Sequence, residues 1–115
     1  MKGINGRRVT KTKKPEKFEN VLEEIKKCIQ EGKYALTVHA LVRQSERRIN
    51  LAETLHVLKT GYEEKRKTCF DIEKNTWKYA IRGKTIRDEL DVRVIIAFNE
   101  DGMFIITVIQ VEKLL

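Results

Sequence analysis

Apolar residues recur at helical spacing in the first half of the chain. Between Phe18 and Ile29 they fall every three or four positions, with charged residues opposite them. Gly32 follows, in the position of a C-terminal cap. Because this spacing places the apolar side chains on one stripe, it predicts an amphipathic helix from residue 18 to about residue 31.

Two further helices are expected in the first half of the chain. Residues 34–38, "YALTV", are short and partly β-branched, which predicts an extended segment that leads into a helix ending near Ile49. Asn50 followed by Glu53 is a capping pair. The pair predicts that a separate helix occupies residues 51–60.

Strand periodicity then replaces helical periodicity. Residues 62–68 lack an apolar face, which is typical of an edge strand. Residues 69–72 either continue this strand or open a hairpin whose turn is formed by residues 73–76. Apolar and polar side chains alternate over residues 77–83, which predicts the next strand.

Two long apolar segments follow. "VRVIIAF" (92–98) and "MFIITVIQV" (103–111) are joined by "NEDG" and are apolar on both faces apart from Arg93, Thr107 and Gln110. Such segments are typical of central strands, and the short connection makes them antiparallel neighbours. The order of elements predicts an α+β domain, with N-terminal helices packed on one face of a roughly four-stranded antiparallel sheet.

Composition is typical of one soluble domain. The chain has 115 residues, of which 41% are hydrophobic and 36% charged. No apolar segment reaches the roughly 18 to 20 residues of a membrane span, and the N-terminus lacks the apolar stretch of a signal peptide. A cytoplasmic protein with no membrane contact is therefore expected. Cys28 and Cys69 have no partner at zinc spacing, which predicts two reduced, buried thiols.

Positive charge is concentrated at the N-terminus. The formal net charge is +7, and residues 1–17 carry seven Lys and Arg residues against Glu16 alone. Because this segment lacks apolar periodicity and contains Pro15, we predict a flexible basic arm over residues 1–16 and a single domain over residues 17–115. The arm either contacts phosphate or an acidic partner, or serves only as a solubilising end.

One face of the second helix carries convergent polar side chains. His39, Arg43, Glu46 and Arg47 fall within an arc of about 100° at helical spacing. A solvated surface would show the same arc. Histidine, however, exchanges protons near neutral pH, and arginines about 6 Å apart along a helix suit backbone phosphates. The face is therefore a candidate site for a phosphate-bearing ligand.

Several strand residues are candidates for the same site. Arg93 interrupts an apolar strand, and a buried arginine is costly unless it pairs with Glu46 or an aspartate, or lines a groove. Trp77 and Tyr79 share one strand face, where they either stack on RNA bases or pack in the core. Thr107 either faces the site or reflects strand propensity alone.

These segments also carry a family resemblance. "LTVHALVRQSERRI", "WKYAIRG", "VRVIIAF" and "FIITVI" make the chain resemble domain-of-unknown-function family 4258 from about residue 34 to residue 111. Members share a histidine-alanine, arginine and glutamate-arginine motif, and many have glycine where this chain has Arg48. That family is similar to the RelE/ParE-like toxins. The resemblance implies a RelE-like fold, metal-independent RNA cleavage without a cofactor, and an antitoxin partner in a type II toxin-antitoxin pair.

The resemblance and the chemistry of RNA cleavage give each candidate a role. The expected catalytic residues are His39, Arg43, Arg47 and Tyr79, and the expected substrate-binding residues are Glu46, Arg93, Trp77 and Thr107. His39 would act as acid or base, and the arginines would hold the phosphate. Tyr79 would protonate the leaving oxygen or stack on a base, and Glu46 would orient an arginine or act as base.

The predicted function is a toxin-like, metal-independent endoribonuclease that acts on mRNA, either free or on the ribosome. The carboxylates are scattered through loops and turns, so no metal site is expected. The alternative is a non-catalytic module that binds RNA or a partner protein through the same arginine face. The presence of only one strong proton-transfer residue favours this alternative, whereas the convergence of the helix side chains favours catalysis.

Overall fold

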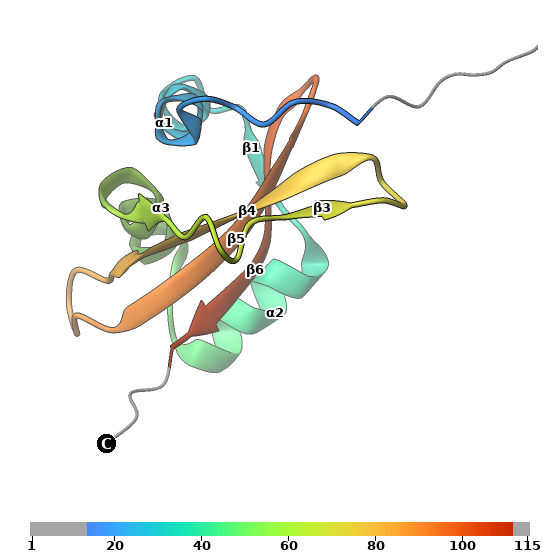
Figure 1. Cartoon of the computed structure of the whole chain (residues 1–115). Coiled ribbons are helices and arrows are strands. Elements are labelled where there is room, and N and C mark those ends of the chain that lie inside the picture. Colours follow the sequence, from blue (N-terminus) through green and yellow to red (C-terminus); the bar gives the residue numbers. More distant parts are fainter. Residues whose placement is uncertain (1–13, 112–115) are drawn as a thin grey trace, which may run out of the picture.

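Three helices and six strands make up the fold (Figure 1). The computed structural model describes residues 14–111. The elements are α1 (Val21–Gln30), β1 (Tyr34–Leu36), α2 (Val38–Arg47), α3 (Leu51–Thr60), β2 (Tyr62–Glu63), β3 (Cys69–Asp71), β4 (Thr76–Lys84), β5 (Asp91–Asn99) and β6 (Gly102–Gln110). The α+β class predicted from the sequence is confirmed.

The sheet is mixed rather than purely antiparallel. Its strand order is β1-β6-β5-β4-β2, and β3 pairs with the other end of β4. β4, β5 and β6 run antiparallel, so the predicted pairing of the two long apolar segments is confirmed. β1 pairs in parallel with β6, from Tyr34 opposite Met103 to Leu36 opposite Ile105. The four-stranded antiparallel prediction was wrong here, because a parallel pair joins distant segments that no local turn signals.

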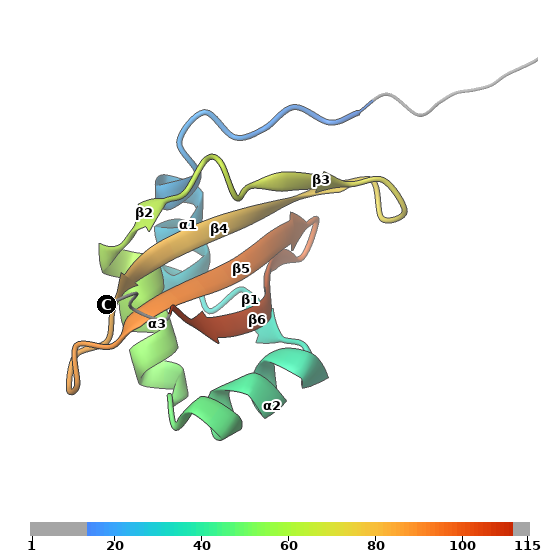
Figure 2. The ribbon, with the colours of Figure 1, turned by 60° about the horizontal axis from the view of Figure 1, so that its bottom comes forward.

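α1 and α3 lie together behind the sheet, whereas α2 runs along β6 at its edge (Figure 2). α2 still shares the core, because Ala40 and the following Ile49 are buried in it and Gln44 accepts a hydrogen bond from Thr54 of α3 at 2.6 Å. The core cluster consists of Val21, Ile25, Ala40, Ile49, Val57, Leu58, Tyr79, Ile81, Val92, Val94, Ile96, Met103, Ile105 and Val108. Among the described residues, no helix covers the opposite face of the long strands, which leaves that face open beside α2 (Figure 2).

Capping fixes where α2 begins. The Thr37 side chain accepts a hydrogen bond from the backbone N–H of Ala40 at 3.1 Å. The same hydroxyl donates to the backbone oxygen of Ile106 in β6 at 2.9 Å. One residue thus starts the helix and ties its N-terminus to the sheet, which explains why α2 stays beside β6.

A residue in the left-handed conformation ends α2. Arg48 follows the helix in the left-handed conformation, with φ of 56°. Its backbone N–H bonds to the carbonyls of Gln44 and Ser45. Glycine adopts this conformation at lower cost than other residues, so Arg48 holds this turn at some cost in backbone strain.

The segment after α3 differs from the predicted edge strand. Only Tyr62 and Glu63 pair with β4, and a turn over residues 64–67 follows. The prediction of a strand over 62–68 was wrong because its charged residues form this turn instead. Cys69, at the start of β3, is exposed, so the expectation that it is buried was also wrong.

The predicted N-terminal arm falls largely outside the described residues, which begin at Lys14. Residues 14–16 lie against the β3–β4 hairpin, where the backbone oxygen of Pro15 accepts a hydrogen bond from the indole of Trp77 at 2.8 Å. The first helix begins at Val21 rather than Phe18, because Asn20 caps it. None of the helices in the described part of the chain has the length and apolarity needed to cross a membrane.

Candidate functional site

α2 brings four of the predicted site residues onto one surface. His39, Arg43, Glu46 and Arg47 all lie within its helical bounds, so the arc predicted from the sequence is present. His39 is exposed in the first turn, and both arginines are partly exposed further along. The helix therefore presents an imidazole and two guanidinium groups on successive turns.

The carboxylate of Glu46 forms ion pairs with both arginines. Glu46 Oε1 lies 2.6 Å from Arg43 Nη1 and 3.8 Å from Arg47 Nη1. The trio has a net charge of +1, because two guanidinium groups share a single carboxylate. Arg47 Nε is buried and, among the described residues, has no hydrogen-bond partner. A buried donor without an acceptor is unusual, but a ligand in solvent cannot reach this nitrogen, so the exposed part of the guanidinium group is what remains for binding.

A groove lies on the open face of the sheet, next to the start of α2. It encloses about 410 Å³, and its lining residues are Thr37, Lys74, Thr76, Lys78, Ala97, Phe98, Asn99, Phe104 and Ile106. Its floor is apolar, while Lys74 supplies positive charge from the β3–β4 hairpin and Lys78 lies in an ion pair with Asp71 at 3.2 Å. Thr37 is only two residues before His39. The groove thus connects the hairpin lysines with the end of α2 that carries the imidazole.

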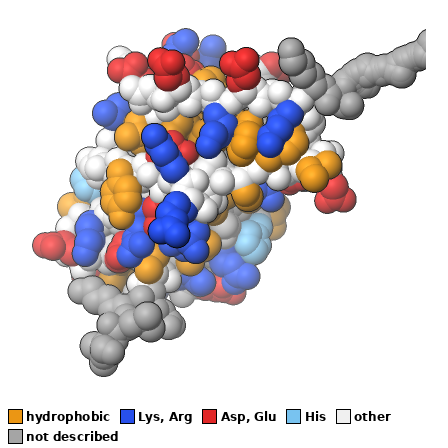
Figure 3. All heavy atoms as spheres, viewed as in Figure 1, with side chains coloured by type: hydrophobic (Ala, Val, Ile, Leu, Met, Phe, Trp, Pro, Cys, Tyr) orange, Lys and Arg blue, Asp and Glu red, His pale blue; other side chains and the backbone are white. Residues whose placement is uncertain are grey.

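Lys and Arg side chains lie beside hydrophobic ones over the β3–β4 hairpin (Figure 3). Thr107 lies on the open face of the sheet, since it is the cross-strand partner of Ile95, and Ile95 projects away from the helix-covered core. A surface that mixes cations with apolar groups suits a ligand that has both phosphates and flat bases.

Arg93 does not join the α2 residues. Its Nε donates to Glu64 Oε1, and its Nη2 donates to Glu64 Oε2 at 3.2 Å. Arg82, its cross-strand partner, also binds Glu64 and in addition Asp91. The sequence prediction left open a pairing with Glu46, an aspartate or a groove. The structure instead pairs Arg93 with Glu64, so this arginine is removed from the candidate site.

Glu64 is predicted to stabilise the fold in a pH-dependent way. The hydrogen bonds from Arg93 and Arg82 hold the pKa of its carboxyl below the usual range, against the opposing effect of burial. We expect Glu64→Gln to lower the free energy of unfolding at pH 7 by about 1 to 3 kcal/mol, because two arginines lose their anion.

The pH profile tests this cause. A carboxyl whose pKa is lowered by folding stabilises the protein above its unfolded pKa, about 4.3, and this contribution disappears as pH falls through the folded value. The difference between wild type and Glu64→Gln in urea denaturation should therefore shrink below about pH 4. The exposed Glu73→Gln is the control. A difference that stays constant down to pH 2 would contradict an ionic cause.

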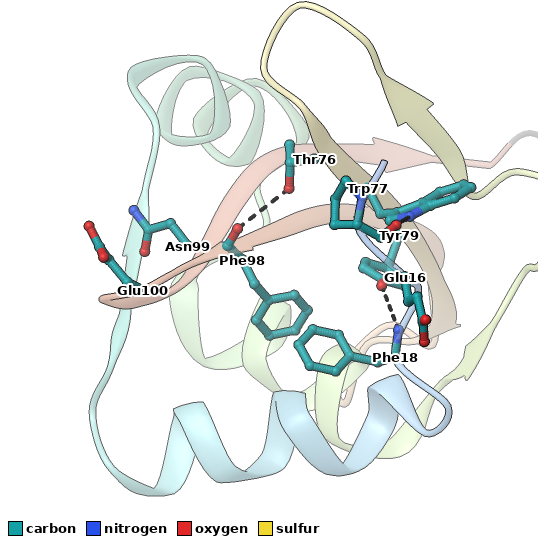
Figure 4. Close-up of a pocket in the computed structure, with 9 residues that line it drawn as sticks. Glu16, Phe18, Thr76, Trp77, Tyr79, Phe98, Asn99 and Glu100 are labelled. Carbon is teal, nitrogen blue, oxygen red and sulfur yellow. Dashed lines mark hydrogen bonds between the residues drawn. The ribbon is translucent and has the colours of Figure 1, made fainter. Parts of the chain in front are cut away.

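Tyr79 lies on the wrong side of the sheet for the predicted catalytic role. Its side chain is 2% exposed and packs against Phe18 and Phe98 on the helix-covered face (Figure 4). The hydroxyl accepts a hydrogen bond from the backbone N–H of Phe18 at 3.0 Å, and burial raises its pKa. Tyr79 is a core residue, one of the two alternatives that the sequence had left open.

Trp77 is also separated from α2. It pairs with Phe70 of β3, and its ring lies beneath the ammonium groups of Lys14 and Lys17. Sequence reasoning missed both lysines, because Lys14 falls in the segment assigned to the arm and Lys17 directly follows that segment. It missed Glu64 as well, since the register that brings this residue to Arg93 depends on a turn with no recognisable motif.

The His, Cys, Asp and Glu side chains of the described residues form no evident metal centre. Within residues 14–111, the structure brings together no group of three or more His, Cys, Asp or Glu side chains that could hold a metal ion. The polar face of α2 carries imidazole and guanidinium groups. Guanidinium groups can bind a phosphodiester, and an imidazole can exchange protons near neutral pH.

Comparison with known proteins places the chain in a family. No curated protein matches the sequence. The family model described as "Domain of unknown function (DUF4258)" matches residues 36–110, which include α2 and all the long strands. This match covers more than half of the 115 residues. The chain therefore belongs to the family of domain of unknown function 4258.

Proposed function

We propose that this protein binds single-stranded RNA through α2 and the adjoining groove on the open face of the sheet. The observation that carries the proposal is the pair formed by Arg43 and Arg47. These arginines lie on successive turns, are partly exposed and share one carboxylate, which leaves a net charge of +1. A backbone phosphate would supply the missing negative charge.

The groove explains why single-stranded RNA is a better ligand than a free anion. Its apolar floor, which includes Phe104 and Ile106, can receive a base whose edges are not paired. Lys74 and Lys78 on the far wall are placed to follow the backbone. A duplex would keep its bases stacked inside and would leave this floor empty, so the proposal names single-stranded RNA.

Cleavage of the bound RNA is the second candidate function, and exposed His39 favours it. An imidazole can take the proton of a ribose 2′-hydroxyl, while Arg43 and Arg47 stabilise the charge that develops on the phosphate. The new 2′-oxygen-to-phosphorus bond would then displace the 5′-oxygen. With Tyr79 in the core, this oxygen would take its proton from water or from protonated His39. This route needs no metal and agrees with a RelE/ParE-like, toxin-type endoribonuclease.

A toxin of this kind would need an antitoxin, and α2 offers it a surface. Val38, Leu41 and Val42 are 76%, 52% and 46% exposed. A hollow beside Leu41 is also bordered by Arg48 and Arg87. A partner segment with apolar and acidic side chains would complement both features. Such a partner would cover the helix that we assign to RNA, which provides a direct means of inhibition.

Arg43→Ala tests the proposed RNA contact. Loss of one phosphate contact should weaken binding about tenfold at low salt, and should reduce the slope of log affinity against log salt by about 0.7. Binding would be measured by fluorescence anisotropy with a labelled single-stranded RNA at several salt concentrations. Lys26→Ala, on α1, removes the same charge from an exposed position away from the groove. Equal effects of the two substitutions, or no binding by the wild type, would contradict the proposal.

A further inference from the structure

We infer that Lys14, Lys17, Phe70 and Trp77 form a second contact for single-stranded RNA, separate from α2. This inference rests on the proposed RNA-binding function. We call the four residues the hairpin cluster, because the two aromatic side chains belong to the β3–β4 hairpin. They lie at the end of the sheet opposite the pairing of β4 with β2. The cluster would bind one backbone phosphate and one base.

The geometry brings two cations to one indole ring. Lys14 Nζ lies 4.7 Å from the ring centroid of Trp77 and 5.0 Å from that of Phe70. Lys17 Nζ lies 5.0 Å from the ring centroid of Trp77. The indole N–H is held by the backbone oxygen of Pro15, and the rings of Phe70 and Trp77 meet edge to face at 5.2 Å. The chain before α1 is thus fastened to the hairpin with its lysines above the rings.

The charges in this cluster are not balanced within it. Both lysines are exposed, and within residues 14–111 neither forms an ion pair with a carboxylate. Two ammonium groups drawn to one ring repel each other, and the attraction of the ring offsets only part of that repulsion. A phosphate between Lys14 and Lys17 would relieve it. An anionic ligand is therefore favoured over a neutral or cationic one.

The aromatic rings identify the rest of the ligand. Phe70 and Trp77 are partly exposed, so a flat group can reach them once the lysine side chains shift from the ring faces onto its phosphate. Stacking of a base on an aromatic ring commonly contributes about 1 to 3 kcal/mol, and lysines beside the ring hold the adjoining phosphate. An acidic protein loop would contact the two lysines but would not stack on the aromatic rings. An unpaired nucleotide would contact the lysines with its phosphate and the rings with its base.

The strand geometry allows one RNA chain to reach both contacts. Trp77 and Lys78 are neighbours on β4, so their side chains project to opposite faces of the hairpin. Lys78 lines the groove beside α2, whereas Trp77 belongs to the hairpin cluster on the other face. RNA that leaves the groove past Lys78 would turn over the hairpin and meet Trp77. Figure 4 shows Trp77 beside the segment that precedes α1.

Trp77 also provides the readout, because it is the only tryptophan in the chain. The experiment titrates the full-length protein with an unlabelled 12-nucleotide oligouridylate and follows tryptophan fluorescence excited at 295 nm. Anisotropy of the same RNA, carrying a label, measures total binding. The variants are Lys14→Ala/Lys17→Ala and the charge-matched control Lys26→Ala/Lys27→Ala, whose residues are exposed on α1. Circular dichroism verifies that each variant is folded.

For the wild type, fluorescence quenching should saturate with the same midpoint as anisotropy. Lys14→Ala/Lys17→Ala should weaken binding about tenfold at low salt and reduce the salt slope by up to about 1.4, the value for two lost phosphate contacts. Lys26→Ala/Lys27→Ala should change the RNA affinity and the salt slope less than Lys14→Ala/Lys17→Ala does. Wild-type binding without quenching, or equal effects of the two double variants, would overturn the hairpin cluster while leaving the α2 proposal intact. Loss of binding in Lys14→Ala/Lys17→Ala, with Arg43→Ala unaffected, would support the cluster and reject α2.

Discussion

Gly61→Ala is expected to destabilise the fold by about 3 kcal/mol or more. Gly61 ends α3 where the helix meets β4. A Cβ atom at this position would press into the backbone oxygens of Arg82 and Val57, and neither can move without displacing its strand or helix. The chain would have to separate α3 from β4, which would open the core around Leu58.

A second glycine provides the control for this prediction. Gly32 has φ of 70°, but a Cβ atom there would meet nothing within 4 Å. Gly32→Ala should therefore cost only the strain of a left-handed backbone, about 1 kcal/mol. Urea denaturation, followed by the fluorescence of Trp77, gives both free energies. If Gly61→Ala were no more destabilising than Gly32→Ala, the close contact between α3 and β4 would be incorrect.

His39→Ala is expected to lower the rate of RNA cleavage by about 10² to 10⁴, with little change in RNA affinity. One proton-transfer group contributes about this much to the chemical step and little to ground-state binding. The measurement uses labelled single-stranded RNA in the presence of a chelator, with and without ribosomes. His56→Ala is the matched control, because His56 is the other histidine of the chain and lies on α3.

The result for the wild type decides between the two candidate functions. The wild-type protein would be tested free of any antitoxin and with ribosomes present. If it binds RNA but leaves the RNA intact, the proposed cleavage fails and the proposed RNA binding remains. Equal loss of cleavage in His39→Ala and His56→Ala would also reject the role of His39. A rate reduced only in His39→Ala would support proton transfer from α2.

Local signals in the sequence predicted several elements well. Asn50 caps α3 by accepting a hydrogen bond from the backbone N–H of Glu53 at 2.8 Å, as the capping pair indicated. The hairpin between β5 and β6 follows from two apolar segments and the short "NEDG" connection. The arc on α2 required only helical spacing. Each of these features depends on residues close together in the chain, where periodicity and capping determine the outcome.

Features that depend on distant segments could not be predicted. Nothing near Tyr34 indicates that β1 pairs in parallel with β6, because the partner lies about 70 residues away. The alternation of β4 placed Trp77 and Tyr79 on one face, but it could not tell which face the helices cover. The same limit applies to Arg93, whose partner Glu64 reaches it through a turn rather than a paired strand.

The proposal that α2 binds RNA is tested most directly by mapping the contact on the protein. The measurement is a titration of isotope-labelled protein with single-stranded oligouridylate, followed by the backbone amide shifts in two-dimensional NMR spectra. We predict that the largest shifts occur in α2, from Val38 to Arg47, and along the groove at Phe104 and Ile106. Amides of α3, on the covered face of the sheet, should change little. Saturable shifts confined to α1 and α3, with α2 unchanged, would contradict the account.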